Sequence, residues 1–216
     1  MPPTPPPRSR TVVLGACRIG VGVAVLVVLA VSYGAQRAAG RGAVVDFLGY
    51  FTHLTSLLAS LLLVVTGALL VAGRRVPPGL TLARGVAAAC LLVVAVVYNV
   101  LTPGAGGAAP WISAVLHVGL PCVVALDWLL VGDRPPLPWR RLGWVLPYPL
   151  LWLAVTLVRG ATDGWVPYGF LLPDRGVGSL ARHVAGLLVT LLVAGALVWA
   201  ASRTRGRWLR RPPAAP

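Results

Sequence analysis

Residues 110–132, PWISAVLHVGLPCVVALDWLLVG, decide the fold that this chain can adopt. The stretch is apolar over about 20 residues, the length of an α-helix that crosses the hydrocarbon core of a bilayer. It nevertheless carries His117, Pro121 and Asp127. Ionisable groups in lipid are costly, so they usually face the interior of a bundle and mark a working site. Because a helical proline lacks an N–H, Pro121 leaves the carbonyl of His117 free and predicts a local opening beside the imidazole.

The composition is that of an integral membrane protein. Hydrophobic residues make up 57% of the 216 residues and charged residues 11%, which excludes an ordinary soluble domain. The formal charge of +14 comes from 19 arginines and five aspartates, without lysine or glutamate. Such a charge would indicate nucleic acid in a soluble protein. Here most arginines flank apolar runs, so we expect membrane lipid as the partner and no nucleic acid.

Further apolar stretches on both sides of the central one predict an all-α protein, a polytopic six-helix transmembrane bundle. They cover, in chain order, residues 11–34, 47–72, 80–101, 142–158 and 179–201. Residues 1–10 are expected to form a disordered, proline-rich tail, residues 11–201 the transmembrane domain and residues 202–216 a basic tail. The first span is interpreted as a retained anchor rather than a cleaved signal peptide, because its apolar run is too long for one.

Six spans place both termini on one side of the membrane, and the arginines indicate which side that is. Thirteen arginines lie on the side of the termini, namely Arg8, Arg10, Arg74, Arg75, Arg84, Arg134, Arg140, Arg141, Arg203, Arg205, Arg207, Arg210 and Arg211. Five lie on the other side, namely Arg37, Arg41, Arg159, Arg175 and Arg182. The positive-inside rule therefore predicts cytoplasmic termini in a multi-pass protein of the plasma membrane.

The cysteines give no sign of metal or redox chemistry. Cys17, Cys90 and Cys122 each lie inside an apolar run and have no CxxC spacing. Small hydrophobic packing residues are the interpretation that this placement favours. We expect no metal site, no disulfide and no cofactor.

Polar residues gather at one predicted depth in the outer half of the bundle. Thr52 lies about 8 Å into the second span and His117 about 10 Å into the central one, at 1.5 Å per residue. The other residues expected at this depth are His53, Thr55, Ser56, Asn99 and His183, with Trp165 and Tyr168 in the connection just outside. Membrane helices often use such residues only to hold one another together. A hydroxyl beside a histidine in a dry pocket is also the minimum for nucleophilic acyl transfer.

Asp127 belongs to a different depth. It lies about 15 Å from His117 along the helix axis, too far to orient the imidazole. We therefore expect a structural, partly buried pair between Asp127 and Arg84, which begins the third span on the same side. The aromatic residues nearby are predicted to form an interfacial belt, comprising Trp128, Trp139, Trp144 and Tyr148.

Four segments resemble one bacterial family of six-span membrane proteins, which is remotely similar to the animal androgen-induced and androgen-dependent membrane hydrolases. They are FTHLTSLL (51–58), LHVGLPCVVALDWLL (116–130), WVLPYPLLWLAVTLVRG (144–160) and GWVPYGFL (164–171). The animal relatives are threonine hydrolases that cleave fatty acid esters of hydroxy fatty acids inside the membrane. The resemblance implies that Thr52 is the nucleophile and His117 the catalytic histidine. The bacterial members often carry asparagine where this chain has Ser56 and His183.

The resemblance thus implies an intramembrane hydrolase of fatty acyl esters. His117 would act as general base for Thr52, and Asn99 or His183 would help to hold the oxyanion. We expect a dyad, because no acidic residue lies at this depth. Two other hypotheses stay open, a transporter or channel with an outward-facing polar vestibule and a non-enzymatic scaffold or regulator.

Overall fold

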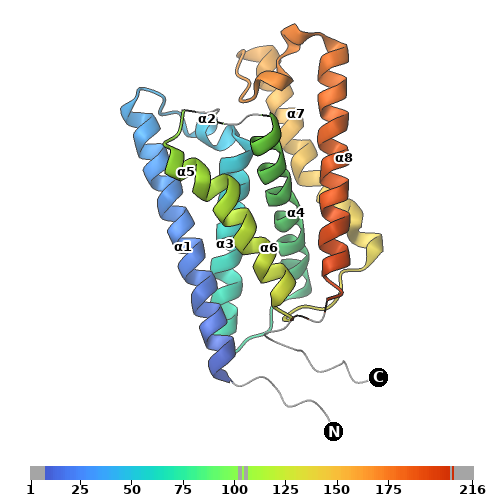
Figure 1. The fold of residues 1–216 in the computed structure, drawn as a ribbon. Helices are drawn as coiled ribbons and strands as arrows, with labels where there is room; N and C mark the ends of the chain where they lie inside the picture. Colours follow the sequence, from blue (N-terminus) through green and yellow to red (C-terminus); the bar gives the residue numbers. More distant parts are fainter. Residues whose placement is uncertain (1–7, 102–103, 105–106, 205, 207–216) are drawn as a thin grey trace.

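The protein is a bundle of six long helices that run alternately up and down (Figure 1). The computed structural model describes residues 8–101, 104, 107–204 and 206, and no strand occurs in this part of the chain. The long helices are α1 (Arg8–Ala38), α3 (Phe51–Val71), α4 (Pro78–Leu101), the continuous unit of α5 (Pro110–Ala114), η1 (Val115–Gly119) and α6 (Leu120–Leu130), α7 (Pro147–Thr162) and α8 (Val177–Ala201). Six helical units of the described chain are long and apolar enough to cross a membrane, which confirms the predicted six-helix bundle. The fifth of these units is Trp139–Thr162, of which α7 is the second part.

The bundle has a lower end, where α1 begins and α8 ends, and an upper end opposite to it (Figure 1). Short helices cover the upper end, namely α2 (Val44–Gly49), η3 (Gly169–Leu171) and η4 (Pro173–Arg175), and η2 (Trp139–Val145) precedes α7. Residues 8–10, which were predicted as tail, belong to α1. The rest of that tail and most of the predicted tail 202–216 lie outside the described residues.

Glycine ends two of the long helices by the same hydrogen-bond pattern. Gly40 and Gly73 have φ of 75° and 68°, a backbone conformation that favours glycine. After α3, the N–H of Gly73 bonds the carbonyl of Leu70 and the N–H of Arg74 bonds that of Leu69. This is a Schellman motif, which satisfies the last carbonyls of a helix.

The second predicted span is divided, a break that the prediction did not include. Tyr50 has an extended backbone (φ −69°, ψ 124°) and separates α2 from α3. The imidazole of His53 bonds the carbonyl of Phe47 at 2.8 Å and so ties the two helices together. Helix α3 consequently begins at Phe51, and Thr52 lies in its first turn, where backbone N–H groups have no acceptor within the helix.

Small residues let α1 approach α3 closely. A Cβ atom on Gly15 would lie 2.6 Å from the carbonyl oxygen of Gly67, and one on Gly22 would lie 2.7 Å from that of Ser60. Such contacts are typical of membrane helices, which gain stability from close backbone packing rather than from the hydrophobic effect.

Four charged side chains form a closed network in the lower half of the bundle. Asp127 accepts hydrogen bonds from Arg18 at 2.9 and 3.0 Å and from Arg84 at 2.8 Å. Asp133 accepts from Arg18 at 2.6 Å and from Arg84 at 3.1 Å. The predicted pair of Arg84 and Asp127 is present in the structure, and Arg18 and Asp133 join this pair to form a network of four side chains. The network joins α1, α4 and α6 and has no net charge, as a buried ionic group in lipid requires.

The predicted aromatic belt is only partly correct. Trp139 and Trp144 are half or more exposed, at 50% and 60%. Trp128 is buried, donates its indole N–H to the carbonyl of Val198 at 2.9 Å, and lies beneath the guanidinium of Arg134. Tyr148 is turned into the bundle, where its hydroxyl bonds that of Thr55 at 2.8 Å.

Gly15→Ala is expected to destabilise the protein by roughly 1–3 kcal/mol, because its methyl group would overlap the backbone of α3. Gly20→Ala in the same helix is the matched control, since a Cβ there meets nothing within 4 Å. The measurement is the melting temperature of both purified variants in one detergent. Equal melting temperatures would contradict the packing described for α1 and α3.

Asp133→Asn is expected to destabilise the fold by about 3–5 kcal/mol at neutral pH, because it leaves buried arginine charge uncompensated. Burial favours a higher pKa for Asp133, but the charges of Arg84 and Arg18 outweigh it and lower the pKa from 3.8 to about 2. A carboxylate with a lowered pKa stabilises the folded state above its ordinary pKa and loses that contribution as the pH falls toward the folded value. The melting temperature of the wild type should therefore fall between about pH 4 and pH 2. Asp133→Asn should show a smaller fall over that range.

Candidate functional site

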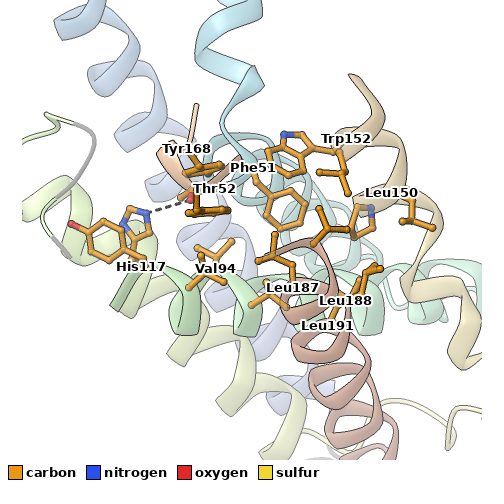
Figure 2. Close-up of a pocket in the computed structure, with 17 residues that line it drawn as sticks. Phe51, Thr52, Val94, His117, Leu150, Trp152, Tyr168, Leu187, Leu188 and Leu191 are labelled. Atoms are coloured by element: carbon orange, nitrogen blue, oxygen red, sulfur yellow. Dashed lines mark hydrogen bonds between the residues drawn. The ribbon is translucent and has the colours of Figure 1, made fainter. Parts of the chain in front are cut away.

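An apolar cavity opens in the upper half of the bundle between α3, α4, α7 and α8 (Figure 2). The space between its walls, counting the open mouth, is about 720 Å³. Aliphatic side chains from three helices form most of its wall, among them Val93, Val94 and Val97 of α4, Leu150 and Leu153 of α7, and Leu187, Leu188 and Leu191 of α8.

Two polar side chains meet at one side of this cavity. The hydroxyl oxygen of Thr52 lies 3.3 Å from Nε2 of His117, and both residues line the cavity (Figure 2). The other ring nitrogen, Nδ1, lies 2.9 Å from the carbonyl oxygen of Ser113. A carbonyl only accepts, so Nδ1 carries the hydrogen and the lone pair of Nε2 faces the Thr52 hydroxyl. That tautomer is the one a general base needs.

The backbone around His117 is a π-helical turn. This turn, η1, spans Val115–Gly119, and the N–H of Leu120 bonds the carbonyl of Val115, five residues earlier. Pro121 follows directly and has no N–H to give to the carbonyl of His117. The predicted local opening beside the imidazole is therefore confirmed, and it takes the form of a π-bulge, a feature found often at functional sites.

An aromatic ring fixes the imidazole from one side. The ring of Tyr98 stacks on that of His117 with 3.6 Å between centroids and 15° between planes. Tyr98 comes from α4 and also lines the cavity. The imidazole is thus held by a ring on one face and a backbone carbonyl at one nitrogen, which leaves Nε2 directed at Thr52.

Tyr168 closes the cavity from above. Burial raises the pKa of its phenol to about 12, while polar contacts with Thr52 and with the backbone of Phe51 act in the opposite direction. Figure 2 shows its ring directly beside Thr52. The phenol therefore lies at the first turn of α3, where the backbone N–H groups are unsatisfied.

Ionic and indole contacts hold the upper connection in place. Arg159 of α7 bonds Asp46 and Asp163, each at 2.8 Å, and lies over the ring of Trp165. Trp152 donates its indole N–H to the carbonyl of Gly49 at 2.8 Å. These contacts join α7 to the segment that precedes Thr52.

Several predicted site residues do not line the cavity. The side chain of Asn99 is exposed and bonds the carbonyl of Ala95 at 2.8 Å, so it cannot serve as the predicted oxyanion donor. His183 bonds the carbonyl of Ser179 at 2.8 Å and stacks behind Phe170. Neither residue is among those that line the cavity with Thr52 and His117.

The remaining predicted residues lie around the pair rather than in the cavity. Thr55 and Ser56 are buried one turn below Thr52, Thr55 bonded to Tyr148 and Ser56 without a hydrogen-bond partner among the described residues. Trp165 packs on Tyr50 outside the cavity wall. Sequence reasoning missed Tyr98 and Ser113. The four-residue spacing from Ser113 to His117 was the signal for the latter.

The fold and the site define a class, a multi-pass helical membrane protein with a Thr/His pair in an apolar cavity. A scan against protein-family models and searches of curated proteins and of solved structures found no match. Among the described residues, no group of three or more His, Cys, Asp or Glu side chains is placed to hold a metal ion.

Proposed function

We propose that the protein is an intramembrane hydrolase of fatty acyl esters, with Thr52 as nucleophile and His117 as general base. The observation that carries this proposal is the 3.3 Å separation of the Thr52 hydroxyl and Nε2 of His117 in an apolar cavity. This distance is at the long end of a hydrogen bond, and catalytic hydrogen bonds in free enzymes commonly tighten when substrate binds.

The first half of the reaction forms an acyl-enzyme. Nε2 of His117 takes the proton of the Thr52 hydroxyl while that oxygen attacks the ester carbonyl carbon. When the tetrahedral intermediate collapses, the carbon–oxygen bond to the alcohol breaks, and the imidazolium gives its proton to the leaving alkoxide. The acyl group is then esterified to Thr52.

Water completes the cycle. His117 takes a proton from water as the water oxygen attacks the acyl carbonyl, and returns it to the oxygen of Thr52 as the fatty acid leaves. The oxyanion of both steps needs donors. The backbone N–H groups in the first turn of α3 and the phenol of Tyr168 are the candidates, in place of Asn99 and His183.

The carbonyl of Ser113 replaces the carboxylate of a triad in this scheme. It fixes the tautomer of His117 through Nδ1, which is the orienting function that a third catalytic member performs. No carboxylate belongs to the residues described around the cavity, so the proposed machinery is a dyad.

Thr52→Ala and His117→Ala are expected to lower ester hydrolysis by about 10²-fold or more, because each removes half of the nucleophile–base pair. Thr52 should also be the residue that a fluorophosphonate probe modifies. Thr66→Ala is the matched control on the same helix, since Thr66 is also buried but bonds the carbonyl of Leu62 at 2.6 Å. Unchanged hydrolysis and labelling in a folded Thr52→Ala variant would refute the proposal.

We also propose that the lower end faces the cytoplasm and that the membrane is the plasma membrane. The arginine excess at that end supports this orientation, and it places Thr52 near the extracytoplasmic surface. Water and the released alcohol would then exchange with the outside.

Cysteine labelling tests the orientation. In a variant without the native Cys17, Cys90 and Cys122, Asp174→Cys should react with an impermeant maleimide on intact cells. Arg74→Cys should react only after permeabilisation. Both positions are exposed, so the opposite pattern would overturn the proposed orientation.

A further inference from the structure

A second apolar cavity lies directly below the first, in the same groove between α7 and the pair α3 and α4. Its empty volume is about 1240 Å³, again counting open space. The residues of α4 that line the lower cavity lie within 79–87, and those that line the upper cavity lie within 93–98. The two cavities therefore follow one another along this helix. The lower wall is also aliphatic, with Leu58, Leu61, Leu62, Val65, Leu80, Leu82 and Val86 among its residues.

Tyr148 stands between the two cavities. Its ring stacks on Phe51, which lines the upper cavity, at 5.4 Å between centroids and 23° between planes. Its hydroxyl bonds Thr55, which lines the lower cavity, at 2.8 Å. The residues on either side of Tyr148 in the chain also belong to different cavities, since Pro147 lines the lower cavity and Pro149 lines the upper one. A side chain from α7 therefore crosses the groove and is fastened to α3.

The upper cavity leads from the Thr/His pair toward this barrier. Its wall on α8 extends from Val184 down to Leu191, which is buried. These residues are seven positions apart, about 10 Å along the helix axis. An acyl chain whose carbonyl lies at Thr52 would follow this wall downward.

We propose that Tyr148 is the floor of the acyl-chain cavity and a specificity-determining residue, one that limits the length of the fatty acyl chain. The inference rests on the proposed hydrolase function. Chains that end above Tyr148 are accepted, and longer chains are refused because the ring blocks the passage to the lower cavity.

Tyr148→Ala is expected to join the two cavities and to move the preference toward longer chains. The measurement is kcat/KM for a series of p-nitrophenyl esters from acetate to palmitate. Relative to the shorter esters, the longest should gain about tenfold or more, since each methylene group that finds room in an apolar pocket contributes substantially to discrimination. Tyr148→Phe keeps the ring and should keep the preference of the wild type.

Trp144→Ala is the matched control. Trp144 lines only the lower cavity and is 60% exposed, so its removal enlarges that cavity without opening the floor. The chain-length preference should not change. Tyr148→Val serves where Tyr148→Ala does not fold, because it also removes the ring.

Thermal stabilisation by free fatty acids of graded length is a second readout that needs no catalysis. The longest acid that stabilises the protein should be longer for Tyr148→Ala than for the wild type. If Tyr148→Ala raises the length of the longest stabilising acid but neither the variant nor the wild type hydrolyses any ester, the role of Tyr148 as the floor is supported and the hydrolase function is refuted. If hydrolysis depends on Thr52 but Tyr148→Ala keeps the wild-type limits in both measurements, the role of Tyr148 is overturned.

Discussion

The closed network of Arg18, Arg84, Asp127 and Asp133 is the interaction on which the packing of this bundle depends. A single charge in the membrane interior is costly, and a pair is stable only when its geometry satisfies both partners. Here every contact between the four groups is 2.6–3.1 Å long. Because α1, α4, α6 and the segment after α6 each supply one group, none of them can rotate or slide without leaving a buried charge unpaired. The lower half of the bundle is thereby fixed.

Helix α7 is held in a different way, and the cavities follow from that difference. Of its residues, all of which the structure describes, only Thr156 is buried. Its links to the rest of the bundle are specific side-chain contacts made by Tyr148, Trp152 and Arg159. A helix held by a few long side chains stands off from its neighbours, and the groove that it leaves against α3 and α4 is the space that both cavities occupy. The rigid wall carries Thr52 and His117, and α7 completes the enclosure.

Hydropathy was sufficient to predict the six spans, because the bilayer imposes one length and one polarity on every helix. The depth of each residue along its span also predicted that Thr52 lies near His117 and that Arg84 lies near Asp127. Depth does not determine which way a side chain points around its helix, and this explains Asn99, whose exposed side chain bonds the carbonyl of Ala95 and does not line the cavity. For the same reason, the sequence did not predict the partners of Arg18 or that the side chain of Tyr148 turns into the bundle. The break at Tyr50 directly follows Gly49, but a single glycine does not by itself end a membrane helix, so the break was found only in three dimensions.

The contrast between the two polar clusters explains why the proposed site has no carboxylate. A carboxylate beside His117 would need a cation or several donors to be stable in lipid, as Asp127 and Asp133 do below. A backbone carbonyl carries no charge, and it orients Nδ1 as firmly. In the proposed reaction it would preserve the tautomer but not the full stabilisation of the imidazolium that acyl transfer requires. The ring of Tyr98, stacked at 3.6 Å, would supply part of that stabilisation, since an aromatic face attracts a cation. The proposed site would thus be charged only during turnover, which is the arrangement that an apolar cavity in a membrane permits.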